Sequence, residues 1–206
     1  MVRAPPKMPI PSRGGYVTLE VRIVPETQII APVVTKEQRE RWVRKGWMKP
    51  EVAEHLDRAF PRNADGKPVI YRLWLRAALR RACEALGYPE EVKKRVLGFS
   101  IVDDRGMPVE YVVIDDEPLR YRRVVFTVDK KCLKSGKPRE QCTTTTTEYY
   151  EYIDATYELR FRVRVPSDVV REFAAALGLA GRIGIMSRTR HGYGKFRVVE
   201  VRTVEG

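Results

Sequence analysis

The sequence predicts an α+β fold of the ferredoxin-like or RRM-like order βαββαβ, with an inserted β-hairpin and an N-terminal arm. Strand-like alternation and helix-like spacing of apolar residues follow one another along the chain in that order. The chain has 206 residues, 43% of them hydrophobic, which suffices for a buried core. We expect an extended arm rich in proline and glycine over residues 1–15. A single domain over 16–206 then carries the hairpin at about 119–153.

The first half of the chain predicts one strand and two helical regions. In residues 16–24 apolar side chains alternate with polar ones, which is typical of a half-buried strand. Residues 36–60 predict a helix with one interruption. Residues 69–86 form the clearest helix, because their apolar side chains recur at helical spacing and Gly87 provides a stop.

The second half of the chain is richer in strands. Alternating or β-branched runs predict strands at residues 97–102, 109–114, 119–128, 143–152, 157–165, 182–186 and 195–203. The third and fourth of these flank a short turn, so we expect them to pair as a long hairpin. A helix is expected between the fifth and the sixth, capped by Ser167 or Asp168.

The charge of the chain favours a polyanionic partner. Lysine and arginine number 39 against 27 aspartate and glutamate residues, so the formal net charge is +12 and the sequence pI is about 9.8. A basic field of this size is typical of proteins that bind RNA or another polyanion. No segment approaches the ~18 apolar residues of a membrane span, and residues 1–13 lack the apolar region of a signal peptide. We therefore expect a cytoplasmic protein with no membrane partner.

The most informative segment is a glycine-rich loop near the end of the chain. Its candidate RNA-binding residues are Arg188, Arg190, His191, Gly192, Tyr193, Gly194 and Lys195. Glycine permits positive φ and the close approach of a ligand to the backbone. Arginine and lysine supply charge for phosphates, and the tyrosine offers a ring on which a base can stack. The loop therefore predicts a site for RNA or another polyanion.

Two arginine faces are further candidate RNA contacts. One follows every fourth residue of the predicted helix and the other alternates along a predicted strand: Arg72, Arg76, Arg80, Arg160, Arg162 and Arg164. Arginines gathered on one sheet face are costly unless water or an anion surrounds them. Each face is either an RNA contact or an ordinary solvated face, and the sequence leaves both interpretations open.

The composition also bears on the cysteines. One asparagine, three glutamines and 32% charged residues indicate a hyperthermophilic source. In such cells an intracellular disulfide can persist, whereas a mesophilic cytosol would keep the thiols free. Cys132 and Cys142 flank a short turn, so we expect them to lie close enough to bridge. Cys83 belongs to an apolar helix face, and the lack of a Cys/His cluster argues against zinc; no cofactor is expected.

Three segments carry a resemblance to a known family. In residues 66–82 an apolar stretch leads into a helix with a Leu-Arg-x-x-Leu-Arg core, although Tyr71-Arg72-Leu73 stands where the family has Pro-Gly-Ser. Residues 157–178 supply a strand and a helix, and residues 191–196 read His-Gly-Tyr-Gly-Lys-Phe. In this order the three segments resemble the RAMP superfamily of CRISPR-associated RNA-binding proteins, whose C-terminal glycine-rich loop has a similar Gly-Tyr-Gly pattern.

The resemblance implies a guide-RNA-binding subunit of a ribonucleoprotein effector complex in antiviral defence. In that family the glycine loop and the first helix lie near the RNA backbone, and an inserted hairpin contacts RNA or a neighbouring subunit. Some backbone subunits cut target RNA with an aspartate that follows the first strand. Residues 24–34 contain Glu26 but no aspartate, so metal-dependent cleavage is not expected here.

Two other functions stay open. A metal-independent guide-processing endoribonuclease would use His191 as its base near a 2′-hydroxyl, although the family's catalytic histidine usually lies near the first helix. A structural protein that coats nucleic acid or associates with the ribosome also fits the charge. The pairs Asp103-Asp104 and Asp115-Asp116 are interpreted as turn residues and not as Mg²⁺ ligands. The Gly181-x-x-Gly184 spacing is no nucleotide-binding fingerprint.

Overall fold

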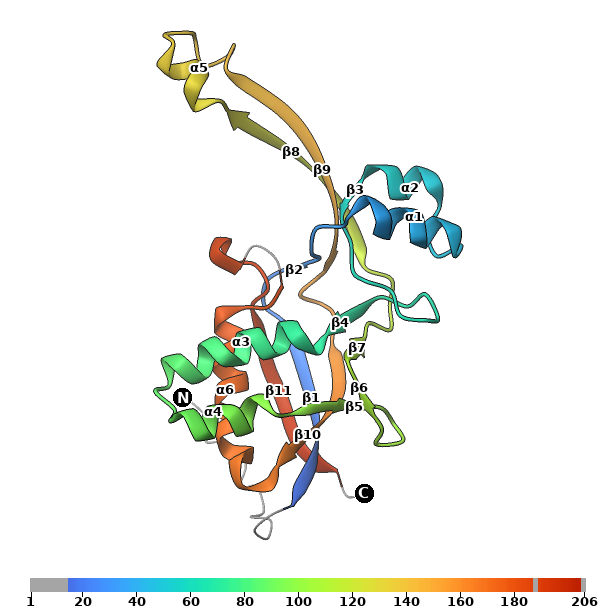
Figure 1. Cartoon of the computed structure of the whole chain (residues 1–206), viewed down its shortest axis with the longest axis vertical. Helices are drawn as coiled ribbons and strands as arrows, with labels where there is room; N and C mark the ends of the chain where they lie inside the picture. The colour runs from blue at the N-terminus through green and yellow to red at the C-terminus, as the bar shows by residue number, and fades with distance from the viewer. Residues whose placement is uncertain (1–14, 187–188, 205–206) are drawn as a thin grey trace. The chain divides into compact units, whose positions relative to one another are not determined.

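The computed structural model of the chain describes residues 15–186 and 189–204 (Figure 1). The side chains at 122–127, 146 and 190, and all of the predicted arm except Gly15, lie outside the described residues. The chain divides into two compact units. Unit 1 comprises Met1–Ile30, Pro61–Glu117 and Ile153–Gly206. Unit 2 comprises Ala31–Phe60 and Pro118–Tyr152, so it contains a segment from the first third of the chain besides the predicted hairpin insertion.

Unit 1 is built on an antiparallel sheet. Its strands, in spatial order, are β11 (Phe196–Val204), β1 (Tyr16–Pro25), β10 (Leu159–Pro166), β5 (Ser100–Val102) and β6 (Pro108–Val109). The alternation in β1 buries Leu19, Val21 and Ile23 almost completely. The strands predicted near 16–24, 157–165 and 195–203 are confirmed.

Helices cover one face of this sheet (Figure 1). The helical elements of unit 1 are α3 (Arg72–Ala85), α4 (Glu90–Leu97), η1 (Ser167–Val169), α6 (Val170–Ile183) and η2 (Thr189–His191). Phe99, just after α4, packs on Phe173 of α6 with ring centroids 5.6 Å apart. A separate ladder joins β4 (Val69–Tyr71) to β7 (Tyr111–Val113), and β2 (Ile29–Ile30) ends the first segment. The α+β class is therefore confirmed, and none of the helices that the structure describes is long and apolar enough to cross a membrane.

The strand predicted at 182–186 is wrong, because α6 continues to Ile183 and no strand follows it before residue 187. Gly181 lies inside α6, where its role is packing. A Cβ at Gly181 would lie 2.2 Å from the carbonyl oxygen of Phe196, so glycine lets β11 approach the helix. Ile185 is buried, as the apolar alternation of a strand would require. Its described backbone hydrogen bond is the one from its N–H to the carbonyl oxygen of Gly194, which does not make a strand.

Three other boundaries also differ from the prediction. The helix predicted over 36–60 gives way to a strand at residue 56. A helix that the sequence analysis did not predict, α4, begins directly after Pro89 and delays the next strand to residue 100. The strand predicted at 109–114 divides at Glu110, because β6 pairs with β5 whereas β7 pairs with β4.

Unit 2 has a small core of its own. Its elements are α1 (Lys36–Arg44), α2 (Pro50–His55), β3 (Leu56–Arg58), β8 (Leu119–Val128), α5 (Lys130–Lys134) and the part of β9 (Thr143–Ile153) up to Tyr152. Trp42 and Met48 are buried with Ala53 of α2 and Leu56 of β3. The fully buried carboxylate of Glu151 accepts a hydrogen bond from the N–H of Phe60 at 3.0 Å, which fixes the chain leaving β3.

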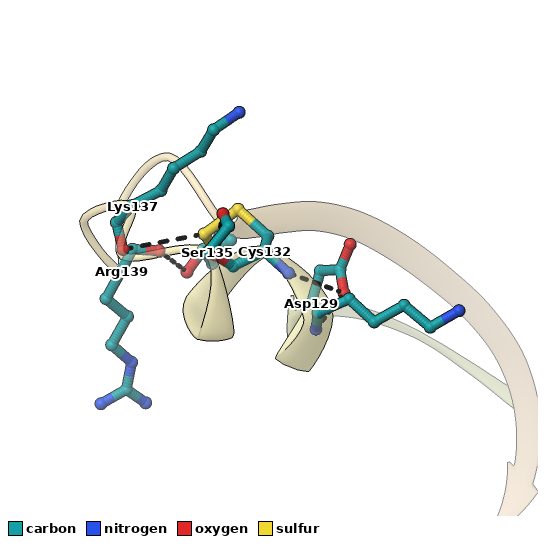
Figure 2. Close-up of a disulfide and its surroundings, with 8 residues drawn as sticks. Asp129, Cys132, Ser135, Lys137 and Arg139 are labelled. Carbon is teal, nitrogen blue, oxygen red and sulfur yellow. Dashed lines mark hydrogen bonds between the residues drawn. A yellow bond between two sulfur atoms is a disulfide. The ribbon is translucent and has the colours of Figure 1, made fainter.

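The long hairpin has the predicted form. β8 and β9 pair antiparallel from Leu119 opposite Tyr152 to Val128 opposite Thr143, and α5 lies at the tip (Figure 1). Cys132 and Cys142 form a disulfide across the tip with a Cα–Cα distance of 5.5 Å (Figure 2).

Candidate nucleic-acid interface

Helix α6 ends in a backbone turn that suits glycine alone. Gly184 follows the last helical residue with a φ of +92°, and a Cβ there would lie 2.8 Å from the carbonyl oxygen of Tyr193. Ile185 is fully buried, and its N–H donates to the carbonyl oxygen of Gly194 at 2.9 Å. This hydrogen bond joins the two ends of residues 184–195, which we call the glycine loop.

The base of the glycine loop is tied to the chain that leaves β1. The N–H of Gly194 donates to the carbonyl oxygen of Gln28 at 2.9 Å, and the N–H of Lys195 donates to the hydroxyl of Thr27 at 3.0 Å. A Cβ at Gly194 would lie 2.1 Å from the carbonyl oxygen of Ile185, so a side chain does not fit. These hydrogen bonds fix Gly194 and Lys195, which form the base of the loop, and thereby fix where residues 189–193 begin and end.

The upper part of the glycine loop faces outward. The side chain of His191 is exposed, whereas Tyr193 and Lys195 are half-buried. Gly192 has a φ of +85°, and no atom lies within 4 Å of a Cβ placed there, in contrast to Gly194. Among the three glycines of the loop, Gly192 alone has open space around the Cβ position, which lets a ligand approach its backbone closely.

One arginine outside the predicted set contacts the glycine loop. Arg188 and the side chain of Arg190 lie outside the described residues. Arg81, which the sequence analysis did not single out, donates from Nη2 to the carbonyl oxygen of Gly184 at 3.1 Å. It follows Arg80 by one position, so it falls outside the row of arginines spaced by four that drew attention to this helix.

The three predicted arginines of α3 divide into two kinds. Arg72 is engaged inside unit 1, because Nε donates to the carboxylate of Glu110 at 3.1 Å and Nη1 donates to the carbonyl oxygen of Phe99 at 2.9 Å. Arg76 and Arg80 are exposed. Only these two present their charge to solvent.

The arginines of β10 have acceptors within the protein. Arg160 donates to the carboxylate of Glu158, and Arg164 donates weakly to the carbonyl oxygen of Gly106 at 3.4 Å. Glu158 also accepts from Arg22 on β1 at 2.7 Å. Hydrogen bonds from Arg22 and then Arg160 lower the pKa of Glu158 to about 2, so this carboxylate stays charged in ordinary buffers.

Arg162, the remaining arginine of β10, belongs to a second row of charges across the same sheet face. Arg162 lies 3.4 Å from the carboxylate of Asp104 and 3.9 Å from that of Glu20. Glu20 in turn pairs with Arg202 on β11 at 2.7 Å. Acidic groups therefore balance much of the positive charge on this face, which favours the interpretation as a self-paired surface over an open polyanion site.

A hollow of about 610 Å³ opens on this sheet face, and its walls carry both signs of charge. Its charged lining includes Glu20, Asp65, Asp104, Asp115, Arg160 and Arg162. Because carboxylates line the hollow together with guanidinium groups, it offers a polyanion no uniform positive field.

The two acidic pairs make different hydrogen bonds. The carboxylate of Asp103 accepts hydrogen bonds from the N–H groups of Arg105 at 3.0 Å and Met107 at 2.8 Å. The N–H groups of Asp115 and Asp116 donate to the hydroxyl of Tyr157. Within the described ranges, no group of three or more His, Cys, Asp or Glu side chains could hold a metal ion.

Comparison with solved structures gives a likeness of fold. A chain of the type III-B Cmr-beta complex, solved by cryo-EM bound to cognate target RNA, matches with a TM-score of 0.61 and 14% identity. The match covers 93% of this chain and 61% of that one. The crystal structure of Cmr6 from Pyrococcus furiosus matches with a TM-score of 0.45 and 10% identity, over 89% of this chain and 99% of that one. No family model and no curated protein sequence matches the chain.

This protein thus shares its fold with a chain of a Cmr complex. At 14% identity the likeness concerns the fold alone, and the chain spans 61% of the length of that Cmr-beta chain.

Proposed function

We propose that this protein is an RNA-binding subunit of a CRISPR-type ribonucleoprotein complex and a member of the RAMP superfamily. The observation that carries the proposal is the likeness to a chain of the RNA-bound Cmr-beta structure, which extends over 93% of this chain. The net charge of +12 supports a polyanionic partner independently of that likeness.

The topology of unit 1 supports a ferredoxin-like core within this proposal. The main elements of unit 1 occur along the chain in the order β1, α3, β5, β10, α6 and β11, which corresponds to βαββαβ. The four strands lie in the spatial order β11-β1-β10-β5, and every neighbouring pair is antiparallel. Because this architecture hosts many unrelated functions, the topology alone does not identify the ligand or the residues that bind it.

The glycine loop is the proposed RNA site, with guide RNA as the proposed ligand. The fixed base and the open backbone at Gly192 allow a phosphate to approach the loop closely. Arg188, Arg190 and Lys195 would supply charge, and Tyr193 a stacking face. Arg76 and Arg80 extend the proposed surface, whereas Arg72 and the β10 arginines contribute less because they already have acceptors within unit 1.

Binding of single-stranded RNA at several salt concentrations tests this proposal. Arg188→Ala and Arg190→Ala should each weaken binding and lower the slope of log K against log salt by about 0.7. Tyr193→Ala should weaken binding by about 1–3 kcal/mol with little change in slope, because stacking releases no counterions. Arg171→Ala is the matched control, since it removes an equally positive, exposed side chain from α6.

Two results would oppose the proposal. If the loop variants bound RNA as the parent protein does, with the same salt slope, the glycine loop would not be the site. If the protein isolated from its native host carried no RNA at low salt, the ribonucleoprotein role would be wrong. We expect a discrete set of small RNAs with related ends instead.

A further inference from the structure

The antiparallel sheet of unit 1 has one short edge and one long edge. On one side it ends in β6, which is two residues long and contains Pro108, a residue that cannot donate a ladder hydrogen bond. On the other side it ends in β11, which is nine residues long. Among the residues that the structure describes, β11 pairs with β1 alone, so the outward N–H and C=O groups of its second edge face no other strand. A long open edge of this kind is a template for another strand.

The β11 edge is regular beyond a single bulge. The register between β1 and β11 shifts once, which leaves Val199 as the extra residue of a β-bulge. Beyond the bulge, Val201 lies opposite the buried Val21 and therefore on the face of the sheet that the helices cover. Glu200 and Arg202 lie on the opposite face, which carries the two rows of charges described above.

The charged face of β11 is complementary to itself. Glu200 pairs with Arg22 at 3.1 Å, and Arg202 pairs with Glu20 at 2.7 Å, so each row of charges ends on this edge. The two rows end with opposite signs. The side chains of Glu200 and Arg202 are 35% and 58% exposed, so both still face solvent. Each can therefore take a second partner of opposite charge from beyond the edge.

We propose that the β11 edge binds the β11 edge of a second copy of this chain, antiparallel and about a twofold axis at Val201. In this register Glu200 of one copy lies opposite Arg202 of the other, and the axis repeats the pair on its far side. Opposite charges in directly opposed cross-strand positions attract. The signs then alternate along each row, from Glu20 and Arg202 in one copy to Glu200 and Arg22 in the other.

Neighbouring registers and another occupant fit the edge less well. A shift of one residue would set the charged face of one copy beside the helix-covered face of the other. A shift of two residues would move the axis to Glu200 or to Arg202 and place two like charges opposite each other. Residues 1–14 of the chain contain four prolines, which cannot donate to a ladder. The charge pattern of the edge therefore selects a second copy.

Sedimentation equilibrium of the nuclease-treated, full-length protein over a range of concentrations tests the proposal. The parent protein should show a reversible equilibrium between monomer and dimer. Glu200→Lys and Arg202→Glu should each weaken dimerisation about tenfold or more, because both Glu–Arg pairs across the axis become pairs of like charge. An equal mixture of the two variants should dimerise with about the affinity of the parent protein, since each variant supplies the charge that the other needs.

Three controls accompany this measurement. Arg105→Glu makes the same change of charge in the turn between β5 and β6, at the opposite edge of the sheet, and should dimerise as the parent protein does. Hydrogen exchange locates the interface, because outward amides within residues 199–203 should exchange more slowly as the protein concentration rises. Thermal unfolding checks that each variant still folds without its contact to Arg22 or Glu20.

Three results would overturn the proposal. The first is a monomer at every concentration, which would leave the edge to a different chain or to none. The second is dimerisation of both single variants as strong as that of the parent protein, because the interface would then lie on another face. The third is a mixture that forms no more dimer than the separate variants. Binding of single-stranded RNA reports on the glycine loop, so the proposed function and this inference can fail separately.

Discussion

Three Gly→Ala substitutions in one stretch of the chain should differ in sign and size. Gly194 has a φ of +76°, and a Cβ there would lie 2.1 Å from the carbonyl oxygen of Ile185. Gly192 has a similar φ of +85° but open space around the Cβ position. Gly178 lies within α6 at a negative φ, also with no atom within 4 Å.

The expected free energies follow from these three geometries. Gly192→Ala should cost about 1–2 kcal/mol, the penalty for an L-residue in the left-handed region. Gly194→Ala should carry the same penalty plus about 1–3 kcal/mol for steric overlap, because the obstructing atom is backbone and Ile185 is fully buried. Gly178→Ala should stabilise by about 0.5–1 kcal/mol, since alanine is the better helix former.

Urea denaturation followed by circular dichroism measures all three free energies of unfolding. The order of stability should be Gly178→Ala above the parent protein, then Gly192→Ala, then Gly194→Ala. Equal losses for the two loop variants would mean that the base of the glycine loop is not packed as described. RNA binding gives a second readout, because Gly192→Ala should reduce affinity more than its small effect on stability explains.

Three further predictions concern acid stability, the thiols and catalysis. The pKa of Glu158 is lowered from 4.5 to about 2, so its stabilisation is complete above pH 4.5 and is lost as the pH falls toward 2. Glu158→Gln should flatten the pH dependence of urea stability in that interval, and an unchanged curve would contradict the ion-pair geometry. Denatured protein purified without reductant should show one free thiol, Cys83, whereas three would exclude the bridge. Structured repeat RNA in EDTA should stay intact with the parent protein and with His191→Ala; cleavage by the parent alone would favour the endoribonuclease.

Local periodicity predicted most elements of the fold. The alternation in β1 and β10 and the apolar stripe of α3 each depend on a few neighbouring residues, so they can be predicted from the sequence. Cys132 and Cys142 bridge as expected, because a short turn between two strands places them opposite each other. The strand predicted at 182–186 failed because the role of Gly181 is set by β11, which follows it by fifteen residues.

The candidate site was harder to predict, because partners distant in the sequence decide it. Arg72 and Arg76 look equivalent in the sequence, yet Glu110 engages Arg72, and nothing near either residue indicates the difference. Arg162 likewise meets Glu20 on another strand. Arg81 contacts the glycine loop through a carbonyl oxygen, an acceptor that has no sequence signature. A sequence shows where charges occur, but their acceptors depend on tertiary structure.

The five consecutive threonines of β9 have a consequence for the pairing of the hairpin. Residues 143–147 lie opposite 124–128, and shifting one strand by one position would still place a threonine opposite four of these five partners. A shift normally exchanges the two faces of a strand and is penalised by the side chains, but a homopolymeric run carries no such penalty.

The alignment must therefore be set outside the run, at both of its ends. At the end of the hairpin farther from α5, Tyr150 and Glu151 are buried, and the carboxylate of Glu151 accepts a hydrogen bond from the N–H of Phe60. At the other end the disulfide links Cys142, the residue just before the first threonine, to Cys132. A reduced hairpin would keep only the alignment at Tyr150 and Glu151, so shifted pairings of nearly equal energy would become accessible to its outer half.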